Sequence, residues 1–205
     1  MAFKLAPVHV WAQGFAYALD KHRKQHTWNA RDITNVTVYA GPSIMEPMRW
    51  IENPISLMQA QYSVPFGIAA ALTTDVNTNP LRMNEALVSN PTTRWLEATM
   101  KKVKISDDPG YMWGYMTFNL NGETVNITAD TYPGIPGALC FDKAVERKFA
   151  NVAKELGVGD EVQDVRDKIL GLKDVEDMSL LLMIWFTWAR RPRPTLLHRS
   201  SVKGS

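Results

Sequence analysis

The chain has 205 residues, 45% of them hydrophobic and 21% charged, which is typical of a globular protein with a substantial core and not of a disordered one. Its formal net charge is only +2, and no basic patch alternates with aromatic residues, so we expect no nucleic acid partner. The single cysteine, Cys140, excludes an intrachain disulfide, a multi-cysteine zinc site and a self-contained iron–sulfur cluster.

Two segments of the sequence indicate where in the cell the protein is expected. Residues 1–20 have no basic head followed by a continuous apolar core, so we expect no secretory signal. The apolar run 178–189 stops at Arg190 and is shorter than the roughly 20 residues that a membrane-spanning helix needs. We therefore predict a packed helix there, and a cytoplasmic protein without a membrane partner.

The first half of the chain predicts three helices and a strand. Residues 9–26 place apolar side chains at helical spacing and then turn basic, which favours a helix. Residues 33–40 alternate and are rich in β-branched side chains, which predicts a strand. Residues 55–73 are apolar and alanine-rich, so we predict a helix that Pro65 kinks or splits. Asn90-Pro91 is a typical helix start, and that helix should run to about residue 101.

A β-hairpin is the clearest local prediction. Tyr111–Leu120 and Glu123–Asp130 are two alternating runs, joined by Asn121-Gly122, the preferred pair for a two-residue type I′ turn. In the second run apolar and polar side chains alternate, so we expect one buried face and one polar face.

Helices follow the hairpin. After a glycine- and proline-rich loop at 132–137, an apolar stripe at helical spacing predicts a helix that carries Val145, Phe149, Val152, Ala153 and Leu156. A shorter helix with Val162, Val165 and Ile169 should follow, and Asp174 should cap the last helix. We expect residues 1–189 to form one α+β domain, with an antiparallel sheet of three to four strands and helices on one face, and 190–205 to form a disordered tail.

Most titratable side chains have an ordinary explanation. His22 and His26 lie four residues apart and could pair on a metal, but the neighbouring lysines and arginine favour a solvated basic helix end. His198 lies in the predicted tail and is expected to be inert. Cys140 is expected to be a small buried hydrophobic residue, with a reactive thiol as the alternative.

The segment Lys4-Leu-Ala-Pro-Val-His9 resembles the start of the second domain in the MmgE/PrpD family, which includes 2-methylcitrate dehydratases and cis-aconitate decarboxylases. The resemblance covers roughly residues 4–185. It includes the helix at Gln59–Leu72, the segment Phe141–Phe149 and the segment Leu172–Asp177.

The resemblance implies site residues that the pattern alone does not. Lys4 would bind a substrate carboxylate and His9 would transfer a proton, with both facing a cleft between two domains. Arg49 is a speculative second carboxylate ligand, with a surface or interface charge as the alternative. A polar, often aromatic position of the family corresponds here to Met45, or is displaced to Tyr39. The family's N-terminal helical domain, with its aspartate and further basic residues, does not resemble any part of this sequence.

The function implied is that of a lyase, without metal or other cofactor, acting on a citrate-like tricarboxylate by dehydration of a 2-alkylcitrate or decarboxylation of an aconitate. The expected partners are this small polycarboxylate and, to complete the cleft, a helical-domain chain or a second copy. Two alternatives remain: a non-catalytic binding or assembly domain, including a truncated remnant, and a repurposed isomerase or cyclase of specialised metabolism.

Overall fold

The computed structural model describes residues 4–108, 114–135 and 141–157 and positions 159, 164, 166 and 167. The chain divides into two units, 1–159 and 160–205, and the elements below belong to the first. Several predicted features lie outside the described residues: Cys140, His198, most of the helix around 162–169, Asp174, the run 178–189, the boundary at 189 and the tail.

The helices of this unit have the following bounds. The α-helices are α1 (Gln13–Gln25), α2 (Pro42–Met45), α3 (Leu57–Tyr62), α4 (Val64–Thr73), α5 (Glu85–Val88), α6 (Pro91–Thr99) and α7 (Phe141–Glu155). Short 3-10 helices are η1 (Val10–Ala12), η2 (Ala30–Asp32) and η3 (Pro80–Arg82). None of the helices in the described ranges is long and apolar enough to cross a bilayer.

The sheet has four strands in the order β2-β1-β3-β4, formed by Lys101–Lys104, Ile33–Ala40, Gly114–Leu120 and Glu123–Ala129. The pairs β1–β3 and β3–β4 are antiparallel, whereas β1 and β2 are parallel. The α+β class is confirmed, and the sheet is mixed instead of wholly antiparallel. A parallel pair needs a long crossover connection, and here α2 to α6 supply it.

Among the strands, β2 is the one that the sequence did not predict, and the helix predicted to run to about residue 101 ends at Thr99. All four residues of β2, Lys-Lys-Val-Lys, are exposed, so it shows no alternation of apolar and polar side chains. Its partner β1 is confirmed at residues 33–40. The hairpin turn is confirmed too, because Asn121 and Gly122 both have positive φ, of 53° and 89°, as a type I′ turn requires.

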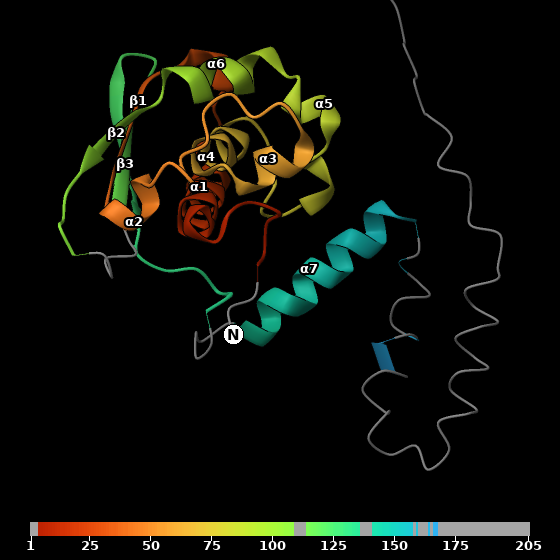
Figure 1. Ribbon diagram of the computed structural model, residues 1–205. Coiled ribbons are helices and arrows are strands. Elements are labelled where there is room, and N and C mark those ends of the chain that lie inside the picture. Colours follow the sequence, from red (N-terminus) through yellow and green to blue (C-terminus); the bar gives the residue numbers. More distant parts are fainter. Residues whose placement is uncertain are drawn as a thin grey trace, which may run out of the picture. The chain divides into compact units, whose positions relative to one another are not determined.

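Helices cover one face of the sheet (Figure 1). The helix α1 packs against β4 and α6 against β1. The core-facing side chains of the sheet include Val38, Met116 and Ile127, which share one rung. The opposite face carries Tyr39 and Tyr115, whose rings stack 4.4 Å apart.

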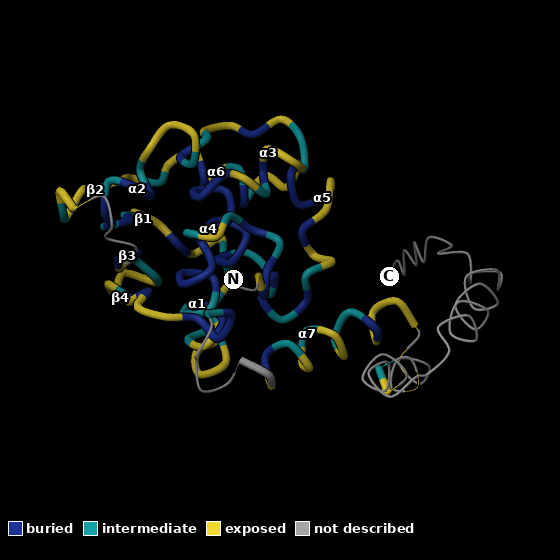
Figure 2. The backbone as a smooth tube through the Cα atoms, turned by 60° about the horizontal axis from the view of Figure 1, so that its bottom comes forward, coloured by how far each residue is buried: buried dark blue, intermediate teal, exposed yellow. Residues whose placement is uncertain are grey.

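The centre of the core is α4, whose residues 64–72 are all buried (Figure 2). The predicted apolar helix is split, as expected, into α3 and α4 at Ser63. The Ser63 hydroxyl accepts a hydrogen bond from the N–H of Phe66 (3.1 Å), and Pro65 occupies the first turn, where its missing N–H is not needed. At the other end, the side chains of Arg23 and Trp28 donate to the carbonyl of Leu72 at 2.8 and 3.1 Å.

The predicted helix after the hairpin is confirmed as α7. Its apolar stripe is only partly covered: Ala153 is buried, whereas Phe149 and Leu156 are each 41% exposed. Ala144 packs with Leu5 and Tyr132 in a small second cluster, which joins α7 to the start of the chain.

Candidate active site

One buried side chain holds the segment that carries Lys4 and His9. Gln13, at the start of α1, is 1% exposed. Its Oε1 accepts hydrogen bonds from the N–H groups of Leu5 (3.1 Å) and Ala6 (3.2 Å). Its Nε2 donates to the carbonyls of Ala6 (2.8 Å) and Val8 (3.2 Å). Both ends of the amide are used, so the main chain between Lys4 and His9 follows one path.

The helix α4 packs against the same segment at Gly67. A Cβ on Gly67 would lie 3.1 Å from the Cβ of Val8 and 3.2 Å from the Cβ of Ala12, closer than side chains normally approach. A glycine at this position therefore lets the segment pack directly on the α4 backbone. Val8 and Ala12, on either side of His9, are completely buried.

His9 ends the segment at the N-cap of η1. Its Nδ1 accepts a hydrogen bond from the N–H of Trp11 (3.3 Å). This bond requires an unprotonated Nδ1, so the proton of the neutral ring is on Nε2. The ring is half-buried and lies at a tilt of 59° to the Tyr62 ring, with 6.4 Å between the ring centres.

The three residues predicted to form the site influence one another. Burial first, and then the positive charges of Lys4 and Arg49, lower the pKa of His9 from 6.5 to about 4. His9 is therefore neutral at pH 7. The Lys4 side chain is exposed and comes from the start of the chain, whereas Arg49 comes from the turn after α2, and both cations are near the imidazole.

Arg49 is held in place by its own neighbours. Its guanidinium forms an ion pair with Glu46 (3.1 Å) and donates to the carbonyl of Ser43. The same group lies 5.6 Å from the centre of the Trp11 ring, on the residue whose N–H binds His9. These contacts orient the cation next to His9, and Glu46 offsets part of its charge.

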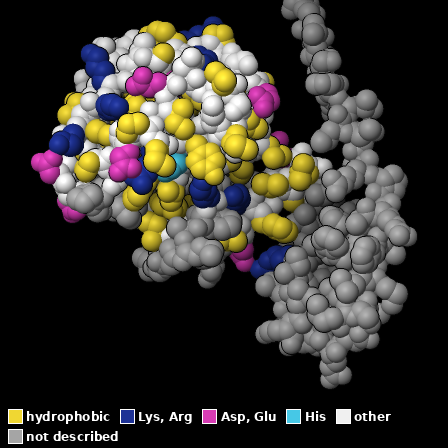
Figure 3. Space-filling model, in the orientation of Figure 1, with side chains coloured by type: hydrophobic (Ala, Val, Ile, Leu, Met, Phe, Trp, Pro, Cys, Tyr) yellow, Lys and Arg dark blue, Asp and Glu magenta, His cyan; other side chains and the backbone are white. Residues whose placement is uncertain are grey.

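A third cation, Lys148 of α7, joins the group. Its Nζ donates to the main-chain carbonyl of Lys4 at 2.6 Å. Burial and the charge of Lys4 lower the pKa of Lys148. On the face seen in Figure 3, a partly visible histidine side chain lies among Lys and Arg, acidic and hydrophobic side chains. The group of Lys4, His9, Arg49 and Lys148 is called the cationic cluster below.

The cationic cluster suits an anion with more than one carboxylate. Lysine supplies a compact charge and arginine a planar fork that can bind a carboxylate through two hydrogen bonds. The Nε2–H of His9 is a further donor, and both charges act on its ring. A bound anion would also oppose the effect of Lys4 and Arg49 on His9 and so raise its pKa.

Residues 7–173 of the chain match the family model of the MmgE/PrpD C-terminal domain. The chain belongs to the MmgE/PrpD family. The matched range contains His9, Arg49 and Lys148, and Lys4 lies three residues before it. None of the curated proteins matches the chain at a significant level. The family accounts for the fold class and for a dehydratase-family relationship, and MmgE/PrpD membership alone assigns neither a substrate nor a reaction to this domain.

His22 and His26, for which a solvated basic helix end was expected and a metal pair was the alternative, lie side by side at the end of α1. The rings of His22 and His26 stack 4.4 Å apart, and burial lowers the pKa of His22. Among the described residues, no group of three His, Cys, Asp or Glu side chains is placed to hold a metal ion.

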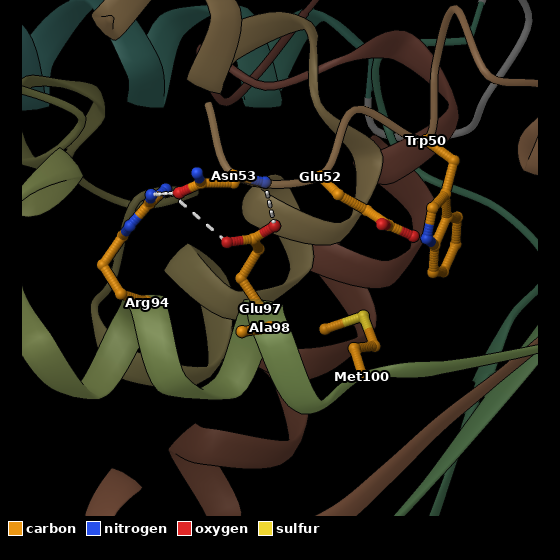
Figure 4. Close-up of a pocket in the computed structure, with 7 residues that line it drawn as sticks. All are labelled: Trp50, Glu52, Asn53, Arg94, Glu97, Ala98 and Met100. Carbon is orange, nitrogen blue, oxygen red and sulfur yellow. Dashed lines mark hydrogen bonds and ion pairs between the residues drawn. The ribbon is translucent and has the colours of Figure 1, made fainter. Parts of the chain in front are cut away.

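A separate hollow of about 390 Å³ lies beside α6 and contains none of the predicted site residues. Figure 4 shows Glu97 and Arg94 reaching from α6 towards Asn53, with Glu52 beside Trp50. Glu97 accepts from the N–H of Asn53 (2.8 Å) and pairs with Arg94 (3.5 Å), and burial raises its pKa. Carboxylates line this hollow, so it does not suit the anion that the cationic cluster suits.

Sequence reasoning missed Gln13, Tyr62 and Lys148. Gln13 stands next to apolar helix positions, and no local pattern distinguishes a buried amide from an exposed one. Lys148 is far from Lys4 in sequence, and its only signal was the Lys-Phe pair that ends the segment resembling the family helix. Their roles arise from tertiary contacts.

Proposed function

We propose that this domain forms one wall of a lyase active site for a citrate-like tricarboxylate, in a cytoplasmic enzyme. The reaction would be dehydration of a 2-alkylcitrate or decarboxylation of an aconitate. The observation that carries the proposal is that Gln13 holds the segment of Lys4 and His9 in place, while the Arg49 guanidinium lies 5.6 Å from the ring of Trp11, whose N–H binds His9. The family supports the reaction class, since its members include the corresponding dehydratases and decarboxylases.

Each residue has a role that follows from its position. Lys4 and Arg49 bind substrate carboxylates, and their charges stabilise the negative charge that develops on a carboxylate-stabilised carbanion or enolate. His9 presents Nε2–H to the substrate, because Nδ1 is occupied by the N–H of Trp11. When the anion raises the pKa of His9, the ring becomes a proton donor. In dehydration it would protonate the leaving hydroxyl, while a base of the polypeptide that completes the cleft takes the carbon-bound proton. In decarboxylation it would protonate the carbanion left when carbon dioxide departs.

The active site would be completed by a second polypeptide. His9 is only half-buried, and a lyase of this kind needs its reacting carbon shielded from water. Beside the cluster, Tyr62 and Met58 on α3 are 58% and 71% exposed. An apolar rim of this kind suits a helical-domain chain or a second copy that closes over the substrate.

Activity assays test this proposal. The domain is mixed with 2-methylcitrate or cis-aconitate, alone and with an MmgE/PrpD N-terminal domain, and formation of product is followed by NMR. We expect turnover in the complex that falls at least about tenfold in His9→Gln and Lys4→Met. An exposed control, Lys21→Met, should keep full activity. Turnover that is unaffected by both site substitutions, or no turnover in any mixture, would contradict the proposal.

A non-catalytic binding or assembly domain is the second candidate, and one observation favours it. Ile55, Met58 and Tyr62 form a stripe on and just before α3, and Ile55 is 81% exposed. Such a surface favours association even without catalysis. Sedimentation of the wild type and of Met58→Glu tests this candidate: a complex that Met58→Glu dissociates, combined with inactivity of the wild type, would support it, whereas a wild-type monomer would contradict it.

A further inference from the structure

We propose that Lys148 is a positioning residue for Lys4: it holds the Lys4 main chain where the Lys4 ammonium lies next to His9 and can meet a substrate carboxylate. The part that concerns the substrate rests on the proposed function, whereas the part that concerns Lys4 and His9 does not. Three observations support this role.

The first observation is the contact itself. The Lys148 Nζ donates to the carbonyl of Lys4 at 2.6 Å, which joins α7 to a segment from the other end of this unit. A hydrogen bond from an ammonium to a carbonyl is stronger than one between neutral groups. On the other side of Lys4, Gln13 binds the main chain from Leu5 to Val8. Gln13 thus fixes the segment after Lys4, and Lys148 fixes Lys4 itself.

The second observation is that α7 packs on the same segment. Leu5, the neighbour of Lys4, lies in a buried cluster with Tyr132 and Ala144. Ala144 is four residues before Lys148, so the two lie on one face of α7. One face of this helix therefore makes an apolar contact with Leu5 and a polar contact with Lys4. Together they determine where the exposed Lys4 side chain begins.

The third observation is that the residue which binds the Lys4 carbonyl is itself a lysine, and so carries a charge of the same sign as Lys4. Burial and the charge of Lys4 both lower the pKa of Lys148, so the charged form of this lysine is less favourable here than in water. A neutral donor would hold the same carbonyl without this unfavourable effect. A lysine also adds a positive charge to this part of the domain, which favours a ligand with several negative charges.

The test measures the pKa of His9 by NMR titration in the ligand-free domain. Lys4→Met should raise the pKa of His9, because one of the charges that lower it is removed. Lys148→Met leaves that charge in the protein but releases its anchor, so it should give a smaller rise in the pKa of His9 than Lys4→Met does. In the double variant, Lys148→Met should add nothing to Lys4→Met. Lys148→Arg, which keeps the donor, should match the wild type, as should Lys143→Met on the same helix.

Two outcomes would overturn the inference. One is an unchanged pKa of His9 in Lys148→Met. The other is a rise of equal size with and without Lys4, which would mean that Lys148 acts directly by its own charge. If circular dichroism shows that Lys148→Met does not fold, Lys148→Gln replaces it. The same change in the pKa of His9 is expected for Lys148→Gln.

Citrate affinity, measured by calorimetry, separates this inference from the proposed function. Lys148→Met should weaken citrate binding about tenfold, as the displacement of one charged ligand would, and Lys148→Arg should restore it. If the wild type does not bind citrate, the proposed function fails, while the pKa pattern still decides whether Lys148 positions Lys4. If the wild type binds and Lys148→Met binds equally well, the role of Lys148 fails and the proposed function stands.

Discussion

The side-chain amide of Gln13 pairs with the main chain of Ala6 in both directions: Nε2 donates to the Ala6 carbonyl at 2.8 Å, and Oε1 accepts from the Ala6 N–H at 3.2 Å. This pairing resembles the bonding between neighbouring strands, made here by a side chain. It ties the start of α1 to the segment that ends at His9, and so contributes to the stability of the fold.

Gln13→Met should lower the free energy of unfolding by about 2 kcal/mol or more, because buried N–H and carbonyl groups of residues 5–8 lose their partner. Urea denaturation measures this change. Gln25→Met, at the exposed end of the same helix, is the matched control and should change stability little. A loss in Gln13→Met no larger than that of the control would contradict the prediction.

Stability should depend on pH through His9. In the folded protein its pKa is about 4, whereas in the unfolded chain it is near 6.5, so between these values the unfolded chain binds the extra proton. The contribution of His9 to stability is therefore complete above about pH 6.5 and is lost as the pH falls towards about 4. Denaturation of the wild type and of His9→Gln at pH 7 and pH 5 tests this.

The wild type should lose more stability between these two pH values than His9→Gln does. Comparison with the variant removes the contributions of other titrating groups, His22 among them. Equal losses in the two proteins would mean that the imidazole titrates normally when folded.

Binding of a polycarboxylate should raise the pKa of His9. The anion offsets the charges of Lys4 and Arg49, while the effect of burial remains, so we expect a partial return towards 6.5. NMR titration of the ring with and without citrate measures the change. In Arg49→Gln the ligand-free pKa should already be higher and the response to citrate smaller, whereas Arg31→Gln should behave as the wild type. A citrate-bound pKa at or below the ligand-free value would contradict the proposed binding site.

Gly114 should tolerate no side chain. A Cβ there would lie 2.1 Å from the carbonyl oxygen of Tyr39, so β3 and β1 would have to separate. Gly114→Ala should cost at least about 2 kcal/mol of stability by thermal or urea denaturation. Gly159→Ala is the control, since nothing lies within 4 Å of its added Cβ. A stable Gly114→Ala with an intact sheet would show that the two strands can move apart easily.

Local patterns predicted much of the fold. Asn121-Gly122 determines the hairpin because only residues that accept positive φ form this turn, and Ser63 with Pro65 determines where one helix ends and the next begins. The strand β2 escaped prediction because its pairing with β1 is parallel and depends on a crossover of about 60 residues, from Gly41 to Met100.

Only those residues of the candidate site that lie close together in the sequence could be predicted. Lys4 and His9 lie in one short motif, so a resemblance could identify them together. The position of Arg49 next to His9 depends on the turn after α2, and the contact of Lys148 with Lys4 depends on the packing of α7. Long-range contacts of this kind leave no periodic pattern in the sequence.

The parallel strand β2 also determines where the sheet ends. It is an outer strand, and Lys101, Lys102 and Lys104 are exposed along it. A second molecule that approached edge to edge would bring its own row of ammonium groups against this one, and the repulsion would oppose further strand pairing. The three lysines therefore oppose the pairing of two molecules through this edge of the sheet.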